Sequence, residues 1–474
     1  MKYESAVAFI TIAAQLGLQA QNKKETKPNI VFILADDLGW GDLSCYGSPV
    51  ATPNIDRLAL QGTLFTNFYV AGSVSSPSRT GLITGCYPAR NLIFDYLATP
   101  ELNKQRGIPD NLNTDVTTIA DVFKAGGYVT GHFGKWHLGL TVKPDEYGFV
   151  DYRTDRASNI EGKGAMDIWS PAKRPTCTRD VLNETFDFIR RNQNKPVYVN
   201  AWLSDVHGTL NPSPEQLARL NNLKDPKVSF NGVLQIFYAA VVEMDRQVGL
   251  FLDSLLQMGL DQNTIIIFSS DNGPEDYNVR DAAHSGVGSP GHLRGRKRSI
   301  YDGGIRTPFI VRWPNHIPEG VVNDDAILCG IDFIPTLCSL TRTKLPENLN
   351  LDGEYMSAAL LGNANVLRTK PLFWEWRINV FGHVSNICPR LAMRSGDWKY
   401  LMNPDGSRKE LYNIKKDPME IDNLASENAN LVESFSVELL NWYKTLPVCD
   451  YVHPRAGNNQ YPWPTTERLR KLKN

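Results

Sequence analysis

Apolar runs alternate with stretches of helical periodicity over the first three quarters of the chain. Short continuous apolar runs are typical of strands buried on both faces, and they occupy residues 30–34, 128–133, 197–203, 264–268 and 309–312. Apolar side chains three and four positions apart predict helices between these strands, the longest over residues 233–258. Because strands that alternate with helices indicate βαβ units, we expect an α/β fold in which helices sandwich one large, mostly parallel sheet.

A polar segment at residues 342–350 ends this alternation. The pattern beyond it predicts short strands and one helix, at residues 391–402, 409–412 and 431–443. We therefore expect a large N-terminal domain over residues 25–342 and a smaller C-terminal α+β domain over residues 350–474.

The first twenty residues have the pattern of a secretion signal. Lys2 precedes an apolar run at residues 6–14, and Ala20 supplies the small residue of a cleavage site. The run is too short to cross a bilayer as a helix, and no later run is long and apolar enough to do so. We expect an exported protein with a signal peptide at residues 1–20 and no transmembrane segment. The alternative is the N-terminal helix of a cytosolic protein.

The composition adds two constraints. The 474 residues carry a net charge of −1, so bulk charge gives no reason to expect nucleic acid as a partner, and any anion must be bound locally. The seven cysteines include no CxxC pair that would indicate zinc. Their odd number leaves at least one thiol unpaired, and both disulfides and buried free thiols stay open for the others.

Polar side chains follow the predicted strands, at the edge where a parallel sheet binds its ligands. Asp36 and Asp37 come directly after the first strand, and Asp271 and Asn272 follow the run at residues 264–268. Carboxylates brought together repel one another unless a cation neutralises them. Because all the donors are oxygens, the ion expected is calcium or magnesium rather than zinc. One such pair alone would be assigned to a turn or a helix cap, but two pairs favour a metal site.

The segment SSPSRTGLITG at residues 75–85 carries the second chemical signal. Pro77 suits the first turn of a helix, and a helix N-terminus offers free N–H groups to an anion. Ser75 would lie just before this helix and Arg79 one turn along it. This arrangement is suited to a tetrahedral oxyanion.

The same segment resembles the motif that defines the type I sulfatases of the alkaline phosphatase superfamily, Cys/Ser-x-Pro-Ser-Arg followed by Thr-Gly. Other blocks of that family are similar and occur in the same order: LADDLG at 34–39, TPNIDRLA at 52–59, GKWHLG at 134–139, FSSDNG at 268–273, RKRSIYDGG at 296–304, RTP at 306–308, LDG at 351–353, GDWK at 396–399 and ELYN at 410–413. The resemblance covers nearly the whole mature chain and implies an alkaline-phosphatase-like fold and a sulfuric ester hydrolase.

The resemblance also implies roles for individual residues. Ser75 would be oxidised to formylglycine (3-oxoalanine), whose hydrate attacks sulfur with one hydroxyl and expels sulfate with the other. The implied ligands of a single calcium, preferred over magnesium, are Asp36, Asp37, Asp271 and Asn272. The implied contacts to the nucleophile and the sulfate are Arg79, Lys135, His137, His207 and Lys297. Of these, we assign His207 to protonation of the leaving alcohol.

Serine in place of the commoner cysteine at position 75 implies a partner. In the family this form depends on a radical-based bacterial maturation enzyme, so we expect a bacterial host and a periplasmic protein. Two further departures are Gly208, Thr209 and Leu210 after His207, where a proline-rich run is usual, and Asp302 in place of glutamate. The implied substrate is a sulfated carbohydrate of glycosaminoglycan or mucin type.

Other side chains have less specific signals. The Gly-rich loop at residues 284–295 could place His284, His292 and Arg294 in a substrate pocket or simply on the surface. Glu375 and Trp376 could form a sugar platform, although aromatic runs more often belong to a core. Two rival functions stay open: a phosphohydrolase of the same superfamily, and a non-catalytic protein that binds sulfated glycans.

Overall fold

The central feature is a mixed sheet whose strand order is β4-β3-β5-β1-β6-β7-β2-β8, with β9 beside β2. The computed structural model describes residues 27–155, 164–225, 232–276, 284–363, 366–380 and 382–458. Strand β1 (Asn29–Ala35) lies at the centre, parallel to β5 (Val197–Trp202) on one side and to β6 (Thr264–Ser270) on the other. Strand β7 (Arg306–Arg312) is antiparallel to β6 and to β2 (Thr63–Tyr69), so the sheet is mostly parallel rather than wholly so. The remaining strands are β3 (Val129–Gly134), β4 (Asp151–Thr154), β8 (Val321–Asn323) and β9 (Leu328–Cys329).

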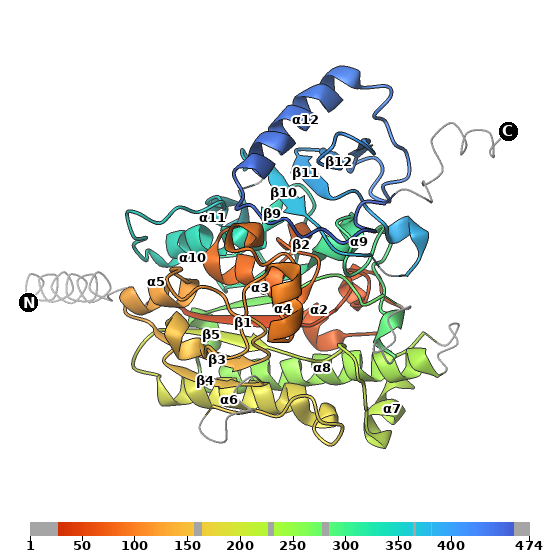
Figure 1. Ribbon diagram of the computed structural model, residues 1–474. Helices are drawn as coiled ribbons and strands as arrows, with labels where there is room; N and C mark the ends of the chain where they lie inside the picture. The colour runs from red at the N-terminus through yellow and green to blue at the C-terminus, as the bar shows by residue number, and fades with distance from the viewer. Residues whose placement is uncertain are drawn as a thin grey trace, which may run out of the picture.

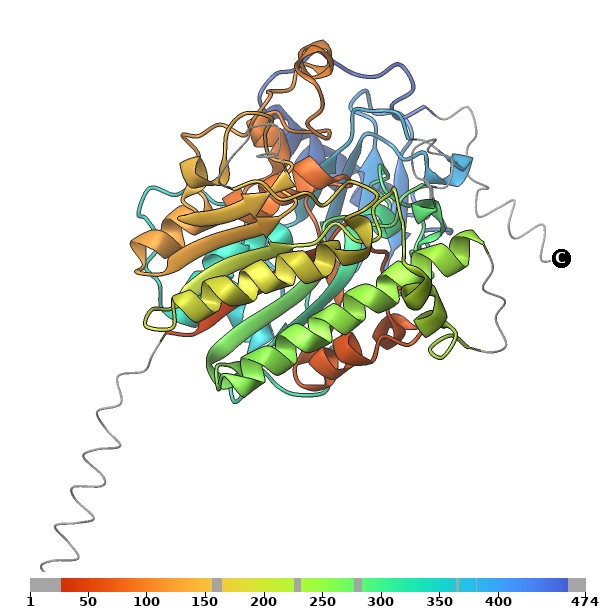
Figure 2. The same cartoon turned by 90° about the horizontal axis from the view of Figure 1, so that it is seen from below.

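Helices cover both faces of this sheet (Figures 1 and 2), because alternate residues of its central strand are apolar on both sides. Ile30, Phe32 and Leu34 belong to one core, while Val31 and Ile33 belong to the other. The first core is covered by α3 (Ser75–Thr84), α5 (Ile119–Ala125), α10 (Phe333–Thr341) and α11 (Ser357–Leu360). The second is covered by α2 (Pro53–Leu60), α6 (Cys177–Arg191) and α8 (Val233–Gln257), and α7 (Pro214–Leu220) packs on α8. Two short helices complete this part, α4 (Pro100–Arg106) and α9 (Asp302–Ile305).

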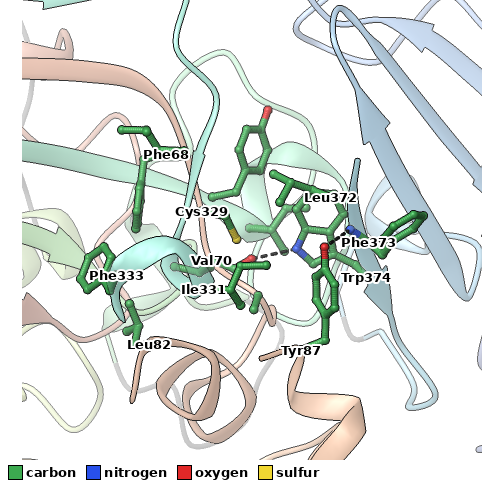
Figure 3. Packing of buried hydrophobic residues seen from close by; sticks show 14 of the residues in the cluster. Phe68, Val70, Leu82, Tyr87, Cys329, Ile331, Phe333, Leu372, Phe373 and Trp374 are labelled. Atoms are coloured by element: carbon green, nitrogen blue, oxygen red, sulfur yellow. Dashed lines mark hydrogen bonds between the residues drawn. The ribbon is translucent and has the colours of Figure 1, made fainter. Parts of the chain in front are cut away.

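A four-stranded antiparallel sheet in the order β10-β11-β12-β13 forms the C-terminal part, with α12 (Ala429–Lys444) against it (Figure 1). Its strands are β10 (Leu372–Glu375), β11 (Leu391–Ser395), β12 (Trp398–Met402) and β13 (Glu410–Asn413). One continuous core joins the two sheets, and Figure 3 shows part of it. There the Trp374 indole N–H donates to the Val70 carbonyl oxygen at 2.8 Å, and the Phe373 N–H donates to the Tyr87 hydroxyl at 3.2 Å. The fold predicted from the sequence is confirmed; the boundary proposed at residues 342–350 stays a prediction.

Some local predictions need correction. Strand β2 was not predicted, because Thr66 and Asn67 interrupt its apolar pattern. Helix α3 begins at Ser75 itself instead of after it. The run at residues 391–402 is two strands joined by a turn in which Gly396 has a φ of 54°. All seven cysteines are free thiols.

The predicted signal peptide, residues 1–20, lies outside the described residues. Within the part of the chain that the structure describes, none of the helices combines the length and the apolar character that a membrane crossing requires.

Candidate active site

The carboxyl ends of β1 and β6 bring four polar side chains into one buried cluster. Ala35 pairs with Ser270, so the next residues of both strands meet directly beyond the sheet. The Asp37 N–H donates to Asp271 Oδ1 at 3.1 Å, and Asn272 Nδ2 donates to Asp37 Oδ1 at 2.7 Å. Asp36, Asp37, Asp271 and Asn272 are all at most 1% exposed. The pairing predicted from the sequence is therefore present as a single cluster.

Three buried cations face these carboxylates. Arg79 Nη2 lies 2.8 Å from Asp271 Oδ2 and 3.6 Å from Asp36 Oδ1. Lys135 Nζ is 2.7 Å from Asp36 Oδ2, and Lys297 Nζ is 2.7 Å from Asp37 Oδ2. Charges this deeply buried are stable only when they are paired, so each cation fixes the position of a particular carboxylate.

Burial and pairing move the pKa values of the carboxyl groups in opposite directions. Burial raises the pKa of Asp36 to about 7, because it outweighs the attraction of Lys135. Burial acts on Asp271 as well, but there Arg79 and then Lys135 hold the pKa well below its ordinary value. Arg79 makes its two short bonds to Asp271, through Nε at 3.1 Å and Nη2 at 2.8 Å, which accounts for the difference.

Ser75 lies at the first position of α3 and reaches this cluster. Its Oγ is 3.4 Å from Asp36 Oδ1 and accepts a hydrogen bond from Lys135 Nζ at 3.0 Å. The residue is 2% exposed, and Arg79 follows one turn later on the same helix. The positive end of the helix, Arg79 and Lys135 surround this hydroxyl with groups that stabilise negative charge.

His207 and His137 come from two other strand ends. His207, in the loop after β5, has Nε2 3.7 Å from Asp37 Oδ2 and a side chain that is 29% exposed. Its partly buried position, Lys297 and Lys135 lower the pKa of His207 below its ordinary value. His137 Nε2 lies 3.1 Å from the Leu97 carbonyl oxygen, and the Leu97 N–H donates to Ser76 Oγ at 3.0 Å. His137 is thus connected to the start of α3 through Leu97.

The loops that carry these residues contain several residues with a left-handed backbone conformation. Four of the non-glycine residues with positive φ lie in this region: Asp37 at 61°, His137 at 55°, Val206 at 65° and Arg298 at 73°. Such conformations cost energy in residues with a Cβ, and they persist where the surroundings enforce them, often at functional sites.

Several of the grouped atoms could hold a cation. Oxygens of Asp36 and Asp37 and a ring nitrogen of His207 lie within 4.8 Å of one another. Asn272 Oδ1 is buried and accepts no hydrogen bond from the described residues. A buried oxygen acceptor without a donor beside two carboxylates fits a hard metal ion such as calcium. Asp271 lies in the same cluster, where its Oδ1 accepts from Asp37 and its Oδ2 from Arg79.

The less specific candidates lie elsewhere. Arg294 is directed at the C-terminal sheet, where it donates to the Tyr412 hydroxyl at 3.1 Å and the Glu420 carbonyl oxygen at 2.8 Å; its contact with substrate stays a prediction. The sequence could not show this, because motif spacing does not fix the direction of a side chain. His284 is exposed, and His292 is exposed and packs edge-on against Trp40.

The side chains of Glu375 and Trp376 are buried in the C-terminal part. Glu375 is paired with Arg377 at 2.6 Å, and Trp376 is 2% exposed. Both line a small cavity together with Ser73 and Pro77, next to the start of α3. Their contact with substrate stays a prediction.

Three residues of the site were not predicted. Glu275 lies 3.2 Å from Lys297 Nζ and is also bonded to Arg298. Arg174 donates to the carbonyl oxygens of Ser204 and His207 and so holds the loop after β5. Trp169 packs beside His207 and Lys135. Glu275 could have been found from its position four residues after Asp271, whereas the other two have no sequence signal.

The sequence is similar to known proteins over most of its length. Residues 28–343 match the family model described as Sulfatase, and residues 292–443 match the model described as N-sulphoglucosamine sulphohydrolase, C-terminal. The chain is 30% identical to N-acetylgalactosamine-6-O-sulfatase of Bacteroides thetaiotaomicron over 93% of this chain and 97% of that protein. It is 31% identical to arylsulfatase A of Bos taurus over 85% of this chain and 79% of that protein.

Solved structures show the same architecture. The crystal structure of Ps i-CgsB in complex with k-i-k-neocarrahexaose is 27% identical and superposes with a TM-score of 0.74, covering 90% of this chain and 95% of that one. The phosphonate monoester hydrolase of Agrobacterium radiobacter, at 21% identity and a TM-score of 0.61, shares the fold over 88% of this chain and 96% of that one.

Proposed function

The chain belongs to the sulfatase family and is a sulfuric ester hydrolase, and from this premise we propose that it removes sulfate from a sulfated carbohydrate of glycosaminoglycan or mucin type. The observation that carries the proposal is the position of Ser75 at the start of α3, within hydrogen-bonding distance of both Asp36 and Lys135. The relative named N-acetylgalactosamine-6-O-sulfatase, which this chain matches over almost its full length, supports a carbohydrate substrate.

The nucleophile in this proposal is the hydrated formylglycine formed from Ser75. One of its hydroxyls transfers its proton to Asp36 and attacks sulfur, the S–O bond to the alcohol breaks, and the alcohol leaves with a proton from His207. The second hydroxyl then transfers its proton to His207, which restores the acid, the C–O bond to sulfate breaks, and the aldehyde is restored with release of sulfate. A plain serine would stop at a stable sulfate ester, because it has no second hydroxyl on the same carbon.

The surrounding residues have separate tasks in this scheme. Arg79 and Lys135 hold the nucleophile and stabilise negative charge on it, and Lys297 binds the sulfate. His137 orients a hydroxyl of the nucleophile from the loop after β3. The oxygens of Asp36, Asp37, Asp271 and Asn272 would hold calcium, which when bound supplies positive charge to the nucleophile and a sulfate oxygen.

Two further parts of the proposal concern the cell. A radical-based bacterial maturation enzyme converts Ser75, and the signal peptide directs the enzyme to the periplasm. Co-expression with and without such a maturation enzyme tests the first part, and activity in the periplasmic fraction of the native host tests the second.

A substrate comparison tests the proposed activity. The matured enzyme is assayed with matched sulfate and phosphate esters of one phenol, and with mono- and disaccharides sulfated at defined positions. We expect the sulfate ester to be the better substrate and at least one sulfated saccharide to exceed it in kcat/KM. A preference for the phosphate ester would overturn the sulfatase assignment, and inactivity on every saccharide would overturn the carbohydrate assignment alone.

A further inference from the structure

The site meets solvent at His207. Its carboxylates, Arg79 and Ser75 are at most 2% exposed, whereas the His207 side chain is 29% exposed. In the proposed function His207 protonates the leaving alcohol, so a sulfate ester with its sulfur at Ser75 extends its alcohol part past His207. The residues beside His207 are the ones that the leaving group meets.

Trp169 lies beside His207. Its ring centre is 5.3 Å from that of His207, with the two planes at 71°, and 5.6 Å from Lys135 Nζ, the ammonium group that is bonded to Ser75. Trp169 is half-buried. An aromatic surface therefore adjoins both the proposed proton donor and a cation that contacts the nucleophile.

The orientation of this ring is fixed by several contacts. The indole N–H donates to Asp155 Oδ2 at 2.8 Å, and the Trp169 main-chain N–H donates to Asp167 Oδ1 at 3.1 Å. The Arg174 guanidinium lies 5.4 Å from the ring centre and also binds the His207 carbonyl oxygen. A ring held in this way loses little conformational entropy when a ligand packs against it.

We propose that Trp169 forms one wall of the leaving-group site and selects alcohols that are rings. The C–H groups on the less polar face of a sugar ring would pack on the indole and bury apolar surface of both partners. This inference rests on the proposed function, and it assigns to the ring a contact with the alcohol part only. The sulfate part is bound by the cations inside the cluster.

Binding to an inactive variant tests this assignment without turnover. Ser75→Ala, Ser75→Ala/Trp169→Ala and Ser75→Ala/Trp398→Ala are titrated by calorimetry with inorganic sulfate and with the best sulfated monosaccharide of the substrate panel. Trp398 is the matched control, because it is also half-buried but lies on β12 of the C-terminal sheet. We expect Trp169→Ala to weaken saccharide binding about tenfold, as the loss of one aromatic contact does, and to leave sulfate binding unchanged. The control should change neither.

Each other outcome overturns the inference in a different way. Equal weakening for sulfate and saccharide would mean that Trp169 acts by positioning Lys135 or His207. Unchanged saccharide binding would mean that the alcohol does not touch the ring, while the proposed function would stand. If the parent variant binds no sulfated saccharide more tightly than inorganic sulfate, both the inference and the carbohydrate assignment fail.

Discussion

Substitution of Lys297 should change both the free energy of unfolding and the rate of catalysis, and the two effects can be measured separately. The Lys297 ammonium group lies 2.7 Å from Asp37 Oδ2 and 3.2 Å from Glu275 Oε2, and the residue is 5% exposed. Burial opposes the charge of Lys297, but Asp37 and Glu275 raise its pKa well above the ordinary value. Lys297→Met therefore leaves two buried carboxylates without their shared cation, a change that typically costs about 3–5 kcal/mol.

A second substitution distinguishes this cost from the loss of a sulfate contact. Glu275→Gln removes one of the two carboxylate charges that Lys297 neutralises, so the double variant should regain part of the lost stability, with a coupling of about 0.5–3 kcal/mol. It should not regain turnover, because the sulfate-binding cation is still missing. By analogy with the removal of a single charge-stabilising donor, kcat/KM should fall roughly 10²–10³-fold in both variants.

The assay combines urea unfolding, followed by fluorescence, with steady-state kinetics. Arg294→Ala is the matched control, since Arg294 is also a buried cation but binds Tyr412 and Glu420 in the C-terminal sheet. It should lower stability while leaving kcat/KM of the folded enzyme within a fewfold of wild type. Strictly additive stability effects of Lys297→Met and Glu275→Gln, or equal kinetic losses at Lys297 and Arg294, would refute the reasoning.

Three further predictions follow from the same geometry. Ser75→Ala should abolish turnover while the circular dichroism spectrum stays unchanged, and turnover near wild type would exclude Ser75 as the source of the nucleophile. Removal of divalent ions with a chelator should reduce turnover and lower the unfolding temperature, calcium should restore both better than magnesium, and indifference to the chelator would exclude the metal site. Burial raises the pKa of Glu420 from 4.5 to about 7, despite the pairing with Lys399 at 2.9 Å. The folded state therefore binds more protons than the unfolded state between these pH values, and the free energy of unfolding attributable to Glu420 decreases as the pH rises through this window. Glu420→Gln should remove that decrease, and a pH profile of stability that is the same in the variant and the wild type would contradict the prediction.

The central sheet could be predicted because strands that are buried on both faces have continuous apolar sequences. Strands β1 and β6 are continuous apolar runs for this reason, and the Asp residues that follow them meet because neighbouring parallel strands end together. Strand β2 was not predicted, because Asn67 lies within it. The side-chain amide of Asn67 donates to the Asp324 carbonyl oxygen. A polar residue that is satisfied by a distant partner looks, in sequence, like a break in the strand.

The site was predicted less evenly. Resemblance identified Arg79, Lys135 and Lys297, and in the structure each of them lies against a particular buried carboxylate. Trp169 and Arg174 reach His207 from more than thirty positions away in the sequence, so no local spacing connects them to it. Arg294 belongs to the same stretch of chain as Lys297 but is directed into the C-terminal sheet. Its direction depends on the packing of β13 against Arg294, which the sequence does not show.

The mass of the peptide that contains residue 75 tests the central claim most directly. Enzyme isolated from its native host is digested with trypsin, and the fragment spanning residues 58–79 is measured. Oxidation of Ser75 to the aldehyde predicts a mass about 2 Da below that of the serine peptide, a covalent change that the sequence does not encode. Fully active enzyme whose residue 75 has the mass of unmodified serine would contradict the proposed nucleophile.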